Sequence, residues 1–200
     1  MNKDFILGAV LATIVAAAMF AVTPANTSVT PHNLNVWTSA VEAEVIRTNG
    51  LVEKQYMGPN NITNTGLNWV RDMISNTNAS GRAVYIYLGN GSTAEDVTLL
   101  NLPNQINNTG NCGLYPPSLT YSIVGTGNYS TTQLWTVSGC TGGNIVVNTT
   151  ALFNHSAATT TCTGTTGCTM FAGKNFSAPV TLQNGDQLNI TWYVWAASGG

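Results

Sequence analysis

Apolar residues recur along most of the chain with a period of two, the pattern of a β-strand with one buried face. The clearest case is residues 187–195, where apolar positions alternate with polar or aromatic ones. One face of this segment is uniformly apolar: Leu188, Ile190, Trp192 and Val194. The segment therefore predicts a central strand, amphipathic at first and then apolar on both faces. Residues 41–45 alternate in the same way, with two glutamates on the outer side.

Turn residues separate several more strand-like segments. Glycine and asparagine, which tolerate a positive φ, are concentrated at 89–91, 125–127, 142–143 and 184–186. The segments between these turns predict further strands, at residues 51–57, 83–88, 118–124, 132–137, 144–149, 168–172 and 178–182.

One stretch has a helical period instead. Its apolar residues recur at intervals of three and four: Leu67, Val70, Met73 and Ile74. The pattern predicts a single short helix, with Asn64 or Thr65 capping its first turn. The Asn-rich residues 94–115 predict a long surface loop.

About eight strands with one helix and frequent turns are typical of an all-β fold. We expect an antiparallel β-sandwich or jelly roll, Ig-like or pilin-like, over residues 41–200. Residues 26–40 are expected to form an extended N-terminal donor strand or linker, and residues 1–25 a signal peptide or membrane anchor.

The N-terminal segment is apolar without interruption over residues 5–22. A helix of that length is about 27 Å long, slightly less than the ~30 Å thickness of the bilayer hydrocarbon, so length does not separate a spanning anchor from a signal peptide. Small residues ending at Ala21 or Ala25 suit cleavage, while Asp4 departs from a positively charged head. Either reading implies export or attachment to the membrane through this segment alone.

The composition argues against several classes of function. Only 7% of the residues are charged and the net charge is -2, which excludes the basic surface that nucleic-acid binding requires. Few carboxylates and two histidines leave little for a catalytic site, so we expect no enzyme and no catalytic residues. Metal binding is disfavoured because no Cys-x2-Cys occurs and His155 lies seven residues before Cys162. We expect no cofactor apart from N-linked glycans.

Export would expose the chain to N-glycosylation. Asn-x-Ser/Thr sequons are about twice as frequent as the composition gives by chance. They fall at Asn26, Asn61, Asn78, Asn90, Asn107, Asn128, Asn148, Asn154, Asn175 and Asn189. Their density predicts a glycoprotein whose sugars supply the solubility that a nearly uncharged surface lacks. The alternative to glycosylation is that Asn and Thr are frequent only because they occupy the surface positions of a protein with few charged residues.

Four cysteines in an exported chain predict disulfides rather than free thiols. Three pairings are possible. We favour Cys162 with Cys168, which closes a short loop of small residues, and Cys112 with Cys140, which joins segments beside predicted strands.

The segment after the apolar head is extended. Pro24 and Pro31 prevent a continuous helix, and Leu34 and Val36 alternate with polar residues. A strand on a flexible lead can fold onto its own sheet or complete the sheet of a neighbouring subunit. The second possibility makes a head-to-tail homopolymer, because such a contact does not close. The predicted donor strand is Asn33, Leu34, Asn35, Val36 and Trp37.

This layout resembles the archaeal thread subunits, which are glycosylated extracellular filament proteins joined by donor-strand complementation. The resemblance covers the apolar head, the extended residues 26–36, the sequon-rich sandwich and the strand QLNITWYVW near the C-terminus. It implies that residues near 26–37 insert into the next subunit, and that the filament serves adhesion or contact with other cells and surfaces.

A second resemblance is to structural proteins of tailed phages and archaeal viruses. It rests on TNTGLNWVRDMI, YIYLGNGSTAEDVTLLNLPNQI, TALFN and PVTLQNGDQLNITWYV. The alternatives to a filament subunit are thus a virion structural protein, a membrane-anchored surface protein and a type IV pilin-like subunit. A further alternative is a carbohydrate-binding adhesin that uses some of the five tryptophans, although core packing explains Trp135 and Trp192 better.

Overall fold

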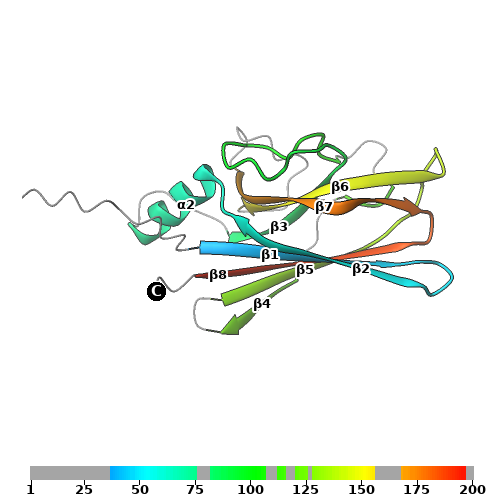
Figure 1. The fold of residues 1–200 in the computed structure, drawn as a ribbon, viewed down its shortest axis with the longest axis horizontal. Helices are drawn as coiled ribbons and strands as arrows, with labels where there is room; N and C mark the ends of the chain where they lie inside the picture. Colours follow the sequence, from blue (N-terminus) through cyan, green and yellow to red (C-terminus); the bar gives the residue numbers. More distant parts are fainter. Residues whose placement is uncertain are drawn as a thin grey trace, which may run out of the picture. The chain divides into compact units, whose positions relative to one another are not determined.

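The computed structural model describes residues 37–75, 82–106, 112–115, 120–125, 128–155 and 168–196. Within these residues the chain forms two antiparallel sheets, of order β2-β1-β8-β5-β4 and β3-β6-β7, and one helix. Figure 1 shows the two sheets stacked face to face, with the helix at one end. The elements are β1 (Trp37–Ile46), β2 (Val52–Asn61), α2 (Asn64–Ile74), β3 (Arg82–Gly89), β4 (Thr120–Gly125), β5 (Asn128–Thr136), β6 (Asn144–His155), β7 (Thr169–Gln183) and β8 (Gln187–Ala196).

The predicted all-β antiparallel sandwich with one short helix is therefore confirmed. Strand boundaries differ by a few residues, and β2, β5 and β6 are longer than their patterns predicted. The predicted signal or anchor at residues 1–25 lies outside the described residues.

The main core lies between the two sheets, and β8 supplies its centre. Leu188, Ile190 and Trp192 are completely buried, as their alternation predicted. β8 pairs with β1 on one side and β5 on the other, so it is a central strand. The indole Nε1 of Trp192 donates to Thr150 Oγ1 of β6 at 3.2 Å and joins the two sheets.

The sandwich begins earlier than predicted. Trp37 pairs with Ala196 and is the first residue of β1, which runs in register beside β8. Assigning Trp37 to a donor strand was therefore wrong, because its backbone belongs to the sheet of its own chain. The boundary at residue 41 moves to 37 for the same reason. The other donor residues, 33–36, lie outside the described residues.

The predicted strands 168–172 and 178–182 are one strand, β7. Gly173 and Pro179 do not end the strand, because β7 stays paired with β6 on both sides of them. Val147 pairs with Val180 and Thr149 with Asn175, so the register shift between them absorbs the proline.

The predicted surface loop at 94–115 is packed onto the molecule instead. Its apolar residues Ala94, Leu102 and Tyr115 are buried in a second core, against the face of the three-stranded sheet that carries Tyr87 and Phe153. The Asn-rich composition concealed these anchors. The described parts of the loop thus form a third layer over β3, β6 and β7.

Gly173 sets the spacing between this layer and β7. A Cβ at this position would lie 2.2 Å from the backbone oxygen of Ala94. We expect Gly173→Ala to lower the free energy of unfolding by about 1–3 kcal/mol, because backbone must move to admit the methyl group. Gly58→Ala in β2 is the control, since nothing lies within 4 Å of a Cβ there. Equal urea midpoints for the two variants would contradict the packed layer.

The helix α2 is capped one residue earlier than predicted. Thr63, and not Asn64 or Thr65, accepts a hydrogen bond from Gly66 N at 3.0 Å. Trp69 packs edge-on against Phe171, with ring centroids 5.8 Å apart. Part of the apolar stripe used to predict the helix is exposed, namely Leu67, Met73 and Ile74. The helix is thus attached to β7 through Gly66 and Trp69 rather than through that whole stripe.

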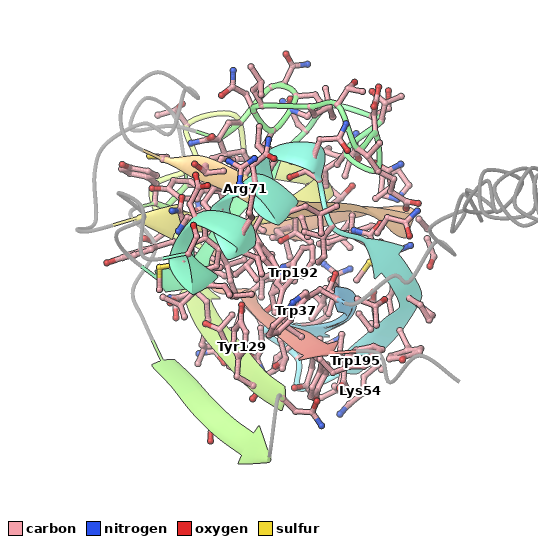
Figure 2. The ribbon with its side chains drawn as sticks, turned by 90° about the vertical axis from the view of Figure 1, so that its left-hand side faces the viewer. Trp37, Lys54, Arg71, Tyr129, Trp192 and Trp195 are labelled. Atoms are coloured by element: carbon pink, nitrogen blue, oxygen red, sulfur yellow. A yellow bond between two sulfur atoms is a disulfide. The ribbon has the colours of Figure 1, made fainter. Side chains whose placement is uncertain are left out.

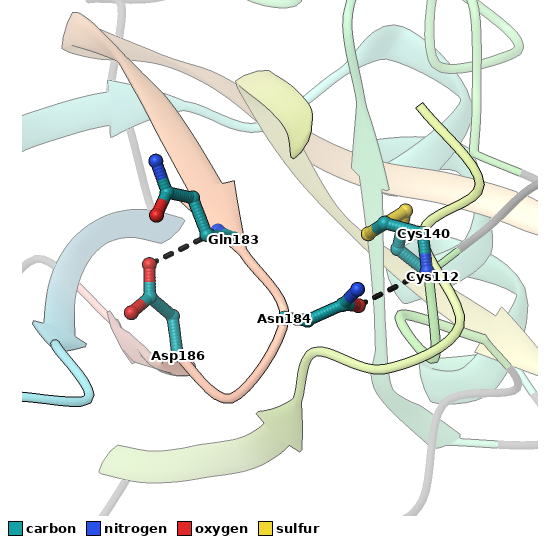
Figure 3. The surroundings of a disulfide bond; sticks show 5 residues. All are labelled: Cys112, Cys140, Gln183, Asn184 and Asp186. Atoms are coloured by element: carbon teal, nitrogen blue, oxygen red, sulfur yellow. Dashed lines mark hydrogen bonds between the residues drawn. A yellow bond between two sulfur atoms is a disulfide. The ribbon is translucent and has the colours of Figure 1, made fainter. Parts of the chain in front are cut away.

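Two fixed points hold the end of the sandwich where β7 turns into β8 (Figure 3). A disulfide joins Cys112 to Cys140, which is the favoured pairing, and Cys140 N donates to Asn184 Oδ1 at 3.0 Å. Asp186, on the other side of the turn, is buried and accepts from Gln183 N at 3.0 Å. Cys168 is also disulfide-bonded, while Cys162, its favoured partner, lies outside the described residues.

Candidate functional site

The outer face of the five-stranded sheet carries a set of polar and aromatic side chains that strand register brings together. Alternation turns Glu42 and Glu44 of β1 outward, and register places them beside β2 and β8. Glu42 lies opposite Tyr56 and Glu44 opposite Lys54. The predicted sharing of one face by the two glutamates is confirmed.

A depression of about 370 Å³ lies on this face near the start of β1. Its lining residues come from four neighbouring strands: Ala40, Glu42, Tyr56, Asn128, Tyr129, Tyr193, Val194 and Trp195. Figure 2 shows Trp195 and Lys54 on the outer side of the sheet, whereas Trp192 lies among the side chains between the sheets. The predicted inward positions of Trp135 and Trp192 are confirmed, and Trp195 is the tryptophan that faces outward into a depression.

Hydrogen bonds fix the polar groups of the depression and its border. Tyr193 OH donates to Glu42 Oε2 at 3.3 Å, and Lys54 Nζ lies 3.1 Å from Glu44 Oε1. The hydrogen bond from Lys54 lowers the pKa of the Glu44 carboxyl, and Asn189 adds to that effect. Burial, followed by the charge of Glu42, raises the pKa of Tyr193. At neutral pH the Glu44 carboxyl is therefore ionised and accepts hydrogen bonds, and the Tyr193 hydroxyl is protonated and donates one.

The edges of the sheets are covered unequally. The β2 and β7 edges close on each other: the side-chain amide of Gln55 donates to Ala178 O at 3.2 Å and accepts from Ala178 N at 3.3 Å. Ile62 and Ala172 form a further bridge between these edges. Two edges are closed by this corner.

The β3 edge is covered by the packed loop and by β5. Ile106 N donates to Leu88 O at 2.8 Å, Thr131 Oγ1 to Val84 O at 2.9 Å, and Tyr129 OH to Ala83 O at 2.8 Å. β4, in contrast, pairs only with β5 among the described residues. It is therefore the open edge of the described sandwich.

The structure separates the predicted glycosylation sites by exposure. Asn61, Asn90 and Asn128 are exposed, and Asn148, Asn175 and Asn189 are half-buried. The half-buried amides make hydrogen bonds: Asn148 Nδ2 donates to Asn90 O at 2.7 Å, Asn189 Nδ2 to Glu44 Oε2 at 3.4 Å, and Asn175 Oδ1 accepts from Ala94 N at 2.9 Å. Asn26, Asn78 and Asn107 lie outside the described residues.

Asn154 differs from the other described sequon residues because it is buried. It is only 5% exposed, and its Oδ1 accepts from Thr169 N at 2.6 Å. It lies in β6, the middle strand of its sheet. We therefore expect no glycan at Asn154 in the folded protein, although the sequon is complete in the sequence.

No group of three or more histidine, cysteine, aspartate or glutamate side chains among the described residues could hold a metal ion. In the same part of the chain, no helix has the length and apolar character needed to cross a membrane.

The sequence patterns did not predict that these outer-face residues form one depression. Tyr193 and Trp195 stand two residues apart on the outward side of their strand, which was a visible signal for an aromatic surface. Tyr56 and Glu42 gave no such signal, because they join the site only through the register of β1 with β2 and β8. Comparisons of the chain with protein-family models, curated proteins and solved structures found no match.

Proposed function

We propose that the protein is a non-enzymatic structural subunit of a glycosylated extracellular filament, in which residues 26–36 of one copy add as a strand to β4 of the next. The proposal is carried by the β4 edge, which pairs with no further strand among the described residues, whereas the other described sheet edges are covered. An edge strand with unpaired N–H and C=O groups is a template for an added strand.

The position of β1 favours a strand from a second copy over the chain's own arm. β4 lies three strands away from β1 in the sheet order, so a strand added beyond β4 lies four spacings from β1. Four spacings amount to about 19 Å. The alternating residues 33–36 directly precede β1 at Trp37, and four residues span at most about 14 Å, which is too short to reach a position beyond β4 of the same chain. Donation between copies is a heterologous contact and builds an open filament.

Deletion of residues 26–36 tests the proposal. We expect the full chain to form fibres and the deleted chain to stay monomeric, as followed by electron microscopy and analytical ultracentrifugation. The sandwich itself should keep its fold, because the buried residues of its described main core all lie within residues 41–194. In the fibre, the amides of residues 120–125 should exchange with solvent more slowly than in the monomer.

A matched pair of variants sharpens this test. Leu34→Asp with Val36→Asp puts charge on the apolar side of the arm, whereas Asn33→Asp with Asn35→Asp adds the same charge on the polar side. Only the first pair should abolish polymerisation, since burying an unpaired carboxylate is costly. Fibres formed equally well by the deletion, or a wild-type chain that never polymerises, would disprove strand donation.

A further inference from the structure

The depression on the outer face contains a glycan acceptor in its wall. Asn128 is the first residue of β5, is exposed, and lines the depression together with Trp195. The two residues are direct cross-strand partners in the β5–β8 pair. Directly opposed residues of an antiparallel pair have Cβ atoms about 5 Å apart on the same face.

The Asn128 sequon is well placed for modification. Alternation along β5 puts Ser130 on the same outer face as Asn128, opposite Tyr193. The middle residue, Tyr129, points the other way and donates its hydroxyl to Ala83 O at 2.8 Å. The two residues that define the sequon, Asn128 and Ser130, therefore face outward.

The depression has the chemistry that recognises a sugar ring. The faces of Trp195, Tyr193 and Tyr56 supply apolar surface for the C–H side of a pyranose, and Tyr56 is 66% exposed. The Glu42 carboxylate, with a side chain 37% exposed, accepts hydrogen bonds from sugar hydroxyls. A volume of about 370 Å³ lies at the small end of the range for ligand sites, which suits a single ring better than a long chain.

We propose that the depression holds the first sugar of an N-linked glycan on Asn128, stacked on Trp195 and hydrogen-bonded to Glu42. In the modification, Asn128 Nδ2 attacks C1 of a sugar carried on a lipid phosphate and presented by a membrane-bound glycosyltransferase. The N–C1 bond forms as the C1–O bond to phosphate breaks. The lipid phosphate leaves with the electron pair, and the amide loses one proton to a base of the transferase.

A sugar attached covalently to Asn128 should occupy the depression more readily than a free sugar. A ring bonded to a residue of the wall has a high effective concentration in the depression, whereas a free sugar loses translational freedom when it binds. The exposed sequon residue Asn61 provides a comparison. Asn61 pairs with Thr38 of β1, and Thr38 pairs on its other side with Trp195, so β1 separates Asn61 from the tryptophan. Asn61 does not line the depression. This inference rests on the export that the proposed function requires, but not on polymerisation.

The test uses the full chain, secreted from a host that attaches N-acetylhexosamine to sequons. Glycopeptide mass spectrometry should find Asn128 occupied. In NMR spectra the ring protons of its first sugar should be shifted upfield by the indole, and those of the Asn61 sugar should not. Trp195→Ala should remove the shift at Asn128, and Trp195→Phe, the variant that keeps an aromatic ring, should retain part of it.

Stability provides the second readout. Trp195→Ala should lower Tm by about 2–4 °C more in the glycosylated protein than in the Asn128→Gln background. The inference is overturned if Asn128 stays unmodified while Asn61 is occupied, or if the Asn128 sugar shows no upfield shift. Free N-acetylhexosamine titrated onto the Asn128→Gln protein separates the sources: saturable binding there, with no shift of the attached sugar, would assign the depression to an external glycan. Fibre formation is measured separately, so a negative result for the glycan would not contradict strand donation.

Discussion

Trp192→Ala is expected to lower the free energy of unfolding by about 3–5 kcal/mol, the range for removing a large aromatic side chain from a packed core. Trp192 has no exposed surface, lies in the central strand β8, and its indole is bonded to Thr150 of the other sheet. Alanine would leave a cavity between the sheets and a buried hydroxyl without its donor. Urea denaturation followed by far-UV circular dichroism measures the loss.

Two controls separate packing from the hydrogen bond. Trp192→Phe keeps most of the apolar volume and should cost less than alanine, because it mainly removes the donor to Thr150. Trp195→Ala, on the outer face of the same strand, should have a much smaller effect in the unglycosylated protein. A loss at Trp192 no larger than that at Trp195 would contradict the assignment of the two faces of β8.

Asp186→Asn is expected to lower the free energy of unfolding at pH 7 by about 2–3 kcal/mol, less than for a fully buried ion pair because Arg47 is partly exposed. Arg47 Nη1 lies 3.0 Å from Asp186 Oδ2, and the backbone N–H groups of Gln183 and Thr48 also donate to the carboxylate. These contacts tie the β1–β2 turn to the β7–β8 turn. The amide loses the charge that makes these hydrogen bonds strong.

The effect should depend on pH with a definite sign. Burial by itself raises the pKa of Asp186, but the hydrogen bonds from Gln183, Arg47 and Thr48 outweigh it, so the folded-state pKa lies below the ordinary value of 3.8. Folding therefore favours the ionised form. Its contribution is fully present above the unfolded pKa and is lost as the pH falls through the folded pKa.

Denaturant titrations at several pH values check this dependence. The difference between wild type and Asp186→Asn should be constant near neutrality and shrink below about pH 4. Asp96→Asn is the control: its carboxylate is exposed and bonded only to Thr98 among the described contacts, so stability should change little. A difference that grows on acidification would refute the role of the ionised carboxylate.

Some features of the candidate site could be predicted from local sequence patterns, and others could not. The sequon at Asn128 and the outward positions of Tyr193 and Trp195 could be found in the sequence, because both depend only on neighbouring residues. That Asn128 lies opposite Trp195, and Glu42 near Tyr193, depends on the register of strands far apart in the chain. Asn154 shows the reverse case, a complete sequon that the pairing of β6 with two neighbours buries.

The sequence by itself determined most of the strands, the two faces of β8 and the short helix, and it favoured Cys112–Cys140 among three possible pairings. The strands and the helix follow from local periods, and burial of the apolar face then follows from the hydrophobic effect. Only the tertiary structure decided that Trp37 belongs to the sheet of its own chain, that the described parts of the Asn-rich loop form a packed layer, and that β4 is the open edge of the described sheets. These depend on contacts between distant segments, whose free energies no local pattern encodes.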